Sequence, residues 1–205
     1  MRQYDFATSS FFITFASKFL EMKFHNESEV LGELKSGDPL IQRRAFESVV
    51  NYYSEKLYWQ IRKLVLSHDD ANDLLQNTFI KAWMSIDLFR GEAKLSTWLY
   101  KIAFNESITF LNRQRAQYNI SLDDQDAFLA QRLESDSYFD GDELQQKLQK
   151  AILTLPEKQR IVFNMRYFDD MPYDEISSIL GTSVGALKAS YHHAAKKIED
   201  FLDKN

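Results

Sequence analysis

The segment between Phe89 and Asn112, FRGEAKLSTWLYKIAFNESITFLN, is the most informative part of this 205-residue chain. It opens with a glycine-containing loop and continues as a predicted helix with aromatic, cationic and amide side chains. Single-stranded nucleic acid is bound by this mixture, because rings stack on unpaired bases while Lys and Arg contact phosphates. A buried core helix is the alternative, since apolar residues lie on most sides. The polar stripe Thr97, Lys101 and Asn105 favours one accessible face.

The predicted helix upstream of this segment contains the sequence DLLQNTF, which begins at Asp73. Its apolar residues recur at helical spacing, and Asp73, Gln76 and Ile80 fall on one face. Taken alone, such a face is the solvent-facing side of a helix. Either Asp69 or Asp70 is expected to cap the start of this helix.

Two further helices are predicted nearer the N-terminus. A short helical pattern covers residues 27–35 and ends at Ser36-Gly37. Asp38 is then expected to cap a long helix whose first residue is Pro39. Apolar residues at three- and four-residue spacing continue this pattern to about residue 65, which indicates a helix with one buried face.

The sequence YDEISSILGTSVGALKASYHHAAKKI, residues 173–198, has the form of a helix-turn-helix. Gly181 can adopt the left-handed conformation that ends the first helix, and Thr182 or Ser183 can cap the second. The second helix of such a motif lies in the major groove, with its N-terminal residues near base edges. An ordinary helical hairpin without a DNA role is the alternative. The candidates for contact with bases or phosphates are Ser183, Gly185, Ala186, Lys188, Ala189, His192, Lys196 and Lys197.

The composition favours an all-α protein. Glycine and proline are few, at six and three residues, and strand-like alternation is scarce. The formal charge of −5 argues against a simple DNA-binding domain. However, the acidic residues are concentrated, since residues 116–146 hold eight acids and one base. The flanking parts are mildly basic, so a partner that supplies most of the affinity for DNA would reconcile the charge with DNA binding.

Several other classes of protein find little support in the residues. The chain has no cysteine, so it can form neither a disulfide framework nor a thiolate metal site. Adjacent His192 and His193 point about 100° apart on a helix and make a poor metal pair. No catalytic motif is present, so we expect no enzyme activity, no metal and no cofactor. The apolar run FFITFASKFL, residues 11–20, is too short to span a bilayer.

Taken in order, four of these segments resemble the extracytoplasmic-function (ECF) sigma factors, the small two-domain branch of the sigma-70 family. They are DLLQ from Asp73, FRGEAKLSTWLYKIAFN from Phe89, LPEKQRIVF from Leu155 and YDEISSILGTSVGALKAS from Tyr173. The resemblance covers residues 27–112 and 143–202. It implies a sigma region 2 domain at 25–113 and a region 4 domain at 143–205. Residues 114–142 would be a flexible acidic linker, and residues 1–24 an N-terminal extension.

The resemblance also implies roles for particular positions. Region 2 would bind the clamp helices of the RNA polymerase β′ subunit, while the loop from Phe89 and the following helix capture and melt the −10 promoter element. Region 4 would recognise the −35 element as duplex through the helix-turn-helix. The matching polymerase-binding positions are Asp73, Leu74, Gln76 and Asn77. The matching −10 positions are Phe89, Arg90, Gly91, Lys94, Trp98, Lys101 and Asn105.

The expected protein is therefore a cytoplasmic, monomeric factor that directs core RNA polymerase to particular promoters, without inserting into a membrane. Members of the family are commonly held inactive by an anti-sigma partner, and we expect one here. A stand-alone helix-turn-helix regulator is the first alternative and would bind DNA without polymerase. An adaptor that binds proteins and no DNA is the second.

Overall fold

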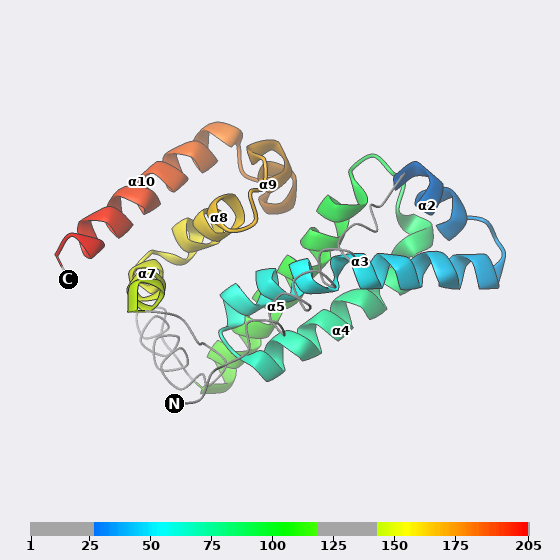
Figure 1. The fold of residues 1–205 in the computed structure, drawn as a ribbon, viewed down its shortest axis with the longest axis horizontal. Coiled ribbons are helices and arrows are strands. Elements are labelled where there is room, and N and C mark those ends of the chain that lie inside the picture. The colour runs from blue at the N-terminus through cyan, green and yellow to red at the C-terminus, as the bar shows by residue number, and fades with distance from the viewer. Residues whose placement is uncertain (1–26, 119–142, 205) are drawn as a thin grey trace, which may run out of the picture. The chain divides into compact units, whose positions relative to one another are not determined.

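The computed structural model describes residues 27–118 and 143–204, and every regular element in these ranges is a helix (Figure 1). The N-terminal extension and nearly all of the predicted acidic linker lie outside the described residues. The described chain divides inside one long helix, between Ser54 and Glu55, into two compact units.

The first unit contains helix α2 (Glu27–Leu34) and the beginning of helix α3 (Pro39–Val65). Gly37 has a φ of 75°, which allows the tight turn between the two helices. Asp38 caps α3 as predicted, because its Oδ1 accepts a hydrogen bond of 2.8 Å from the Leu40 N–H.

The second unit begins with the rest of α3 and continues through helix α4 (His68–Ser85), the short 3-10 helix η1 (Ile86–Leu88) and helix α5 (Leu95–Tyr118). Helices α4 and α5 pack against each other. Helix α5 ends at Tyr118, so the predicted linker start at residue 114 falls within this helix. Several apolar residues in the second half of α3, in α4 and in α5 are buried. They include Leu57, Ile61, Val65, Leu74, Phe79, Leu95 and Leu99.

The start of α4 corrects one prediction. Ser67 is the N-cap, and its side chain accepts a hydrogen bond from the Asp70 N–H. Asp69 and Asp70 lie instead in the first turn, where their charges favour the positive end of the helix. His68 links the two helices, because Tyr58 of α3 contacts one ring nitrogen at 2.8 Å and Asn72 of α4 contacts the other at 3.0 Å.

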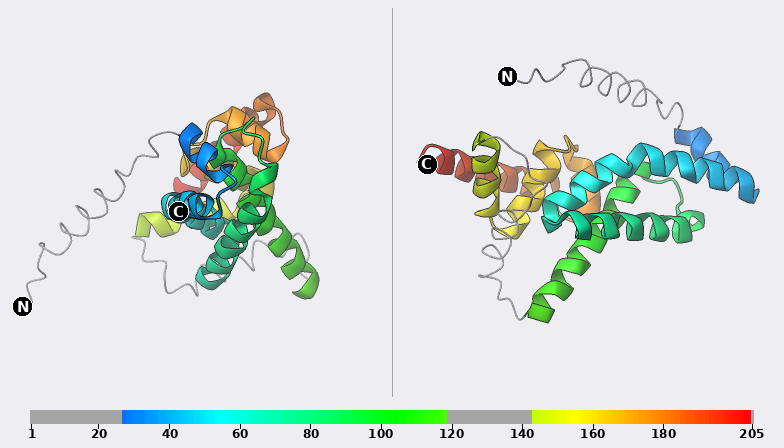
Figure 2. Two further views of the ribbon diagram at one scale, coloured as in Figure 1. Left: turned by 90° about the vertical axis from the view of Figure 1, so that its right-hand side faces the viewer. Right: turned by 60° about the horizontal axis from the view of Figure 1, so that its bottom comes forward.

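The remaining helices are α7 (Glu143–Leu153), α8 (Glu157–Tyr167), α9 (Tyr173–Leu180) and α10 (Val184–Leu202). Helix α10 packs against each of the other three (Figures 1 and 2). Their core contains Ala151, Ile152, Leu155, Phe163, Ala194 and Ile198. Phe163 stacks on Tyr191 of α10 with ring centroids 5.6 Å apart, which ties α8 to α10.

Candidate nucleic-acid and polymerase interfaces

The outer face of α4 carries the predicted polymerase-binding positions. Asp73, Gln76 and Asn77 are exposed. Leu74 is 5% exposed and belongs to the core, so its side chain cannot be part of this outer surface. The three exposed polar residues come from one turn of one helix, which presents them as a group to a partner.

Beyond these polar residues, the same helix exposes apolar side chains. Ile80, Trp83 and Met84 are 56%, 40% and 79% exposed, and Leu88 of η1 is 79% exposed. The sequence pattern places Ile80 beside the polar residues but does not predict that Trp83 lies open to solvent. Exposed apolar residues at helical spacing are typical of a surface that binds another protein.

The loop between η1 and α5 is anchored by aromatic packing. Phe89 is 5% exposed, and its ring packs against Trp98 with centroids 4.9 Å apart. Gly91 has a φ of 77°, which a residue with a side chain rarely adopts. The side chains of Arg90 and Glu92 are both highly exposed, and Arg90 Nη1 lies 3.9 Å from Glu92 Oε1. The loop backbone and Arg90 are therefore accessible, whereas Phe89 supports the loop from beneath.

Helix α5 presents part of the predicted polar stripe. Lys101 and Asn105 are exposed, as expected for residues that contact DNA. Thr97 is only 5% exposed, and its hydroxyl donates to a carboxylate oxygen of Glu175 at 3.2 Å. Lys94 lies just before the helix and contacts the other oxygen of Glu175 at 2.6 Å.

Helices α9 and α10 form the predicted helix-turn-helix. Gly181 ends α9 in the left-handed conformation, with a φ of 63°. Ser183 caps α10 and accepts a hydrogen bond from the Ala186 N–H. Ile176 and Leu187 are buried and so direct the opposite sides of the two helices outward. All eight DNA-contact candidates of this motif are exposed: Ser183, Gly185, Ala186, Lys188, Ala189, His192, Lys196 and Lys197.

Tyr173 lies near two cations, an arrangement that the sequence pattern does not reveal. Its ring lies 5.8 Å from the Lys188 ammonium and 5.6 Å from the Arg166 guanidinium, and it packs edge-on against Tyr191. A cation within about 6 Å of a ring centre is attracted by the negative face of the ring. The Tyr173 ring therefore favours two positive charges beside the start of α9. No spacing rule could have identified this arrangement, because it joins residues of three helices.

The turn after α8 contains a buried ion pair. Lys63 of α3 contacts Asp169 at 2.5 Å, and the two side chains are 15% and 8% exposed. Burial raises the pKa of the Asp169 carboxyl, and the neighbouring ammonium of Lys63 opposes that rise. The Lys63 ammonium also lies 4.9 Å from the centre of the Phe168 ring.

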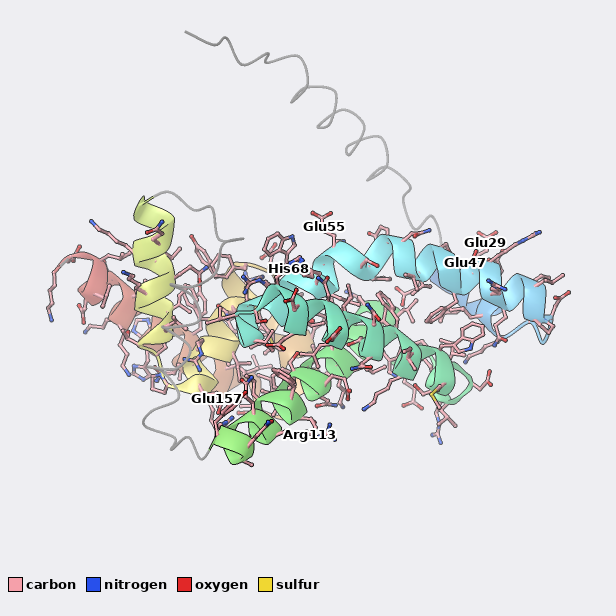
Figure 3. All side chains as sticks on the ribbon, turned by 90° about the horizontal axis from the view of Figure 1, so that it is seen from below. Glu29, Glu47, Glu55, His68, Arg113 and Glu157 are labelled. Atoms are coloured by element: carbon pink, nitrogen blue, oxygen red, sulfur yellow. The ribbon has the colours of Figure 1, made fainter. Side chains whose placement is uncertain are left out.

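Glu157 occupies the first turn of α8, where Figure 3 labels it. It accepts a hydrogen bond of 2.9 Å from Arg115 of α5. Within residues 27–118 and 143–204, no group of His, Asp or Glu side chains is arranged to hold a metal ion. In the same ranges, no helix has the length and apolar character needed to cross a membrane.

Comparison with known proteins agrees with this arrangement. The family model for sigma-70 region 2 matches residues 49–117, and the model for sigma-70 region 4 matches residues 145–198. The ECF RNA polymerase sigma-E factor of Escherichia coli (strain K12) is 31% identical over 168 residues, which cover 77% of this chain and 86% of that protein. The ECF RNA polymerase sigma factor SigW of Bacillus subtilis (strain 168) is 29% identical over 178 residues, covering 83% and 93%.

Solved structures show the same fold. The sigma factor RpoE of Bartonella quintana, in complex with the anti-sigma factor NepR, has a TM-score of 0.60 at 22% identity and covers 77% of this chain and 96% of that one. CnrH, in complex with the cytosolic domain of CnrY, has a TM-score of 0.63 at 22% identity, with coverage of 86% and 96%.

The fold and the exposed helix-turn-helix define a transcription initiation factor of two helical regions. The chain belongs to the ECF sigma factors of the sigma-70 family. These relatives support a sigma factor rather than a stand-alone regulator.

Proposed function

We propose that this sigma factor binds core RNA polymerase through the outer face of α4. Asp73, Gln76 and Asn77 would contact the clamp helices of the β′ subunit with polar side chains. The apolar residues that follow on α4 suit the same protein–protein contact, because their exposure to water is unfavourable until a partner covers them. Leu74 would support this face from the core.

The loop from Phe89 and helix α5 would bind the −10 element as an unpaired strand. Arg90 and Lys94 would meet phosphates, and Lys101 and Asn105 would contact the strand along α5. A base that leaves the stack would be held by the exposed loop around Gly91. Trp98 would contribute a partly exposed ring, while buried Phe89 keeps that ring and the loop in place. Capture of the base offsets an unstacking cost of about a few kcal/mol per step.

Helix α10 would lie in the major groove of the −35 element. The observation that carries the proposal is that all eight candidate residues on and just before this helix are exposed. Small residues at Gly185, Ala186 and Ala189 allow the helix to approach base edges closely, and Lys196 and Lys197 lie where phosphates would pass.

The protein would act by binding and not by catalysis, as a monomer in the cytoplasm, where its polymerase works. Residues 114–142 would link the two DNA-binding regions, and their acidic segment would follow a basic channel of the polymerase. An anti-sigma factor that covers surfaces of both regions would hold the protein inactive. The sigma factor of Bartonella quintana, whose solved complex contains an anti-sigma factor, supports this part of the proposal.

Run-off transcription from genomic fragments tests the proposed function. Purified core polymerase with this protein should give transcripts from defined start sites that core alone does not give. Asn105→Ala should weaken them, and Trp98→Ala should remove stacking worth about 1–3 kcal/mol per base. Lys188→Ala should also lower the yield, whereas Lys204→Ala removes another exposed lysine, near the C-terminus, and serves as the matched control.

The outcomes separate the alternatives. Absence of new transcripts, together with a shift of duplex DNA by the free protein, would contradict the sigma mechanism. Activity that survives the Trp98, Asn105 and Lys188 substitutions alike would mean that the DNA contacts lie elsewhere. Circular dichroism of each variant confirms that the helices are retained.

A further inference from the structure

Met84, near the end of α4, is open to solvent, unlike the other methionines that the structure describes. It is 79% exposed, whereas Met165 and Met171 are 2% and 4% exposed. Met1 and Met22 lie outside the described residues. The chain has no cysteine, so an oxidant that reaches this protein meets no thiol. Within residues 27–118 and 143–204, Met84 therefore carries the sulfur atom that is most accessible to an oxidant.

Met84 lies on the face of α4 that is proposed to bind core polymerase. Asp73, Asn77, Ile80 and Met84 follow one another at helical spacing, and at 3.6 residues per turn they fall within about 60° of the helix circumference. Asp73 and Asn77 are exposed polar residues, and Ile80 is 56% exposed. Met84 therefore belongs to the apolar end of the same surface, beyond the polar residues.

Oxidation changes the polarity of a methionine side chain. Hydrogen peroxide transfers one oxygen atom to Sδ, so the sulfur is oxidised by two electrons, the O–O bond breaks and water leaves. The product, methionine sulfoxide, is polar and chiral. Against the apolar groups of a partner, the sulfoxide oxygen would lose its hydrogen bonds to water without gaining others, which is unfavourable. An interface that accepts the thioether would thus resist the sulfoxide.

We propose that Met84 is a redox modification site, and that its oxidation by peroxide weakens the binding of this sigma factor to core polymerase. The thioether completes the apolar end of the α4 surface, and the sulfoxide lowers the affinity. Methionine sulfoxide reductases reverse this oxidation, so the change is a switch and not permanent damage. The effect on polymerase binding rests on the proposed function, whereas the oxidation of Met84 can be measured on the chain alone.

Peptide mass spectrometry of the full chain after treatment with hydrogen peroxide measures the modification. Met84 should be oxidised about tenfold faster than Met165 or Met171, because the fold shields the two buried sulfur atoms from the oxidant. Treatment in urea should make the three rates similar. Equal rates in the folded chain would overturn the assignment of Met84 as the reactive site.

Surface plasmon resonance on immobilised core polymerase measures the effect on binding. The peroxide is removed first, so that the polymerase itself is not oxidised. The treated wild type should bind about 5- to 30-fold more weakly than the untreated chain, as expected for a polar group without partners in a contact. Reduction by the two methionine sulfoxide reductases, one for each epimer, should restore the affinity. Circular dichroism should show the same helix content before and after treatment.

Three variants assign the effect to one position. Met84→Leu removes the sulfur and keeps an apolar side chain of similar volume, so its treated and untreated forms should bind alike, whatever affinity leucine itself gives. Met171→Leu makes the same change at a buried position and, as the matched control, should respond to peroxide as the wild type does. Met84→Gln introduces a polar group and should weaken binding without peroxide.

Equal loss of affinity in treated wild type and treated Met84→Leu would overturn the proposal, because the effect would then come from another residue. A loss of helix content on oxidation would overturn it too. If treated wild type binds as tightly as untreated while Gln76→Ala weakens binding, the redox inference fails and the proposed function stands. If Gln76→Ala and Met84→Gln both bind like wild type, α4 is not the polymerase surface and the proposed function fails as well.

Discussion

Burial and a neighbouring cation act in opposite directions on Asp169. Burial prevails, so the pKa of this carboxyl lies above its ordinary value of 3.8. A carboxyl whose pKa is raised by folding binds its proton more tightly in the folded state. Its contribution to stability is therefore complete below the unfolded-state pKa and is lost as pH rises through the folded-state pKa.

Replacement of Asp169 by Asn should remove this pH dependence. The wild type should lose stability relative to Asp169→Asn as pH rises from about 3.8 through the raised pKa of Asp169. Above that pKa, the difference between the two free energies of unfolding should stay level. Urea denaturation across this range measures the difference. Lys63→Met removes the opposing cation, so it should move the fall to higher pH. A difference that rises with pH would contradict the assignment.

At the scale of the element, the turn between α9 and α10 depends on a single backbone conformation. Gly181 has a φ of 63°, and a Cβ built on it would meet no atom within 4 Å. The strain of a substitution here therefore comes from the backbone and not from crowding. Gly185 also has open space, but it lies in the first turn of α10 and is not among the glycines with a positive φ.

The two glycines should respond in opposite directions to the same change. Gly181→Ala should lower the free energy of unfolding by about 1–2 kcal/mol, because alanine resists the left-handed conformation. Gly185→Ala should raise it by about 0.4–1 kcal/mol, because alanine can adopt the native geometry here and reduces the conformational freedom of the unfolded chain. Urea denaturation of the full chain compares them. Destabilisation by both to a similar degree would mean that α10 packs differently near its start.

Local sequence patterns predicted the helices well. Each helix buries one face, so its apolar residues recur at helical spacing along the sequence. The long helix from Pro39, the Gly181 turn and the Ser183 cap are all confirmed. The prediction that Asp69 or Asp70 caps α4 was wrong. Several polar residues lie at this helix start, and the N-cap is Ser67, whose backbone is still extended.

At the scale of the whole molecule, the two proposed DNA-binding surfaces involve separate parts of one chain. Sequence patterns predicted both surfaces and the exposure of most of their polar residues, because exposed polar residues and helix caps are local features. They could not predict that Glu175 contacts Thr97 or that Leu74 is buried, since these depend on how distant helices pack. Composition pointed to the need for a partner, as the net charge of −5 makes strong DNA binding by the free protein unfavourable.

Polymerase should therefore raise the affinity of this protein for promoter duplex strongly. Once one region is bound, the other binds as an intramolecular partner, which can increase overall affinity by about 10²–10⁴-fold. Fluorescence anisotropy with a promoter fragment from the run-off experiment, with and without core enzyme, measures the gain. Equal affinities would show that the free protein already presents both surfaces together.

The packing of Phe89 on Trp98 gives the molecule an optical reporter of its own. The chain has three tryptophans, and Trp59 and Trp83 are 51% and 40% exposed, whereas Trp98 lies against an aromatic ring beneath the loop. A nucleobase that stacked on Trp98 would quench its emission, while Trp59 and Trp83 would keep theirs. With phenylalanine at those two positions, strand capture could be followed in real time without a dye.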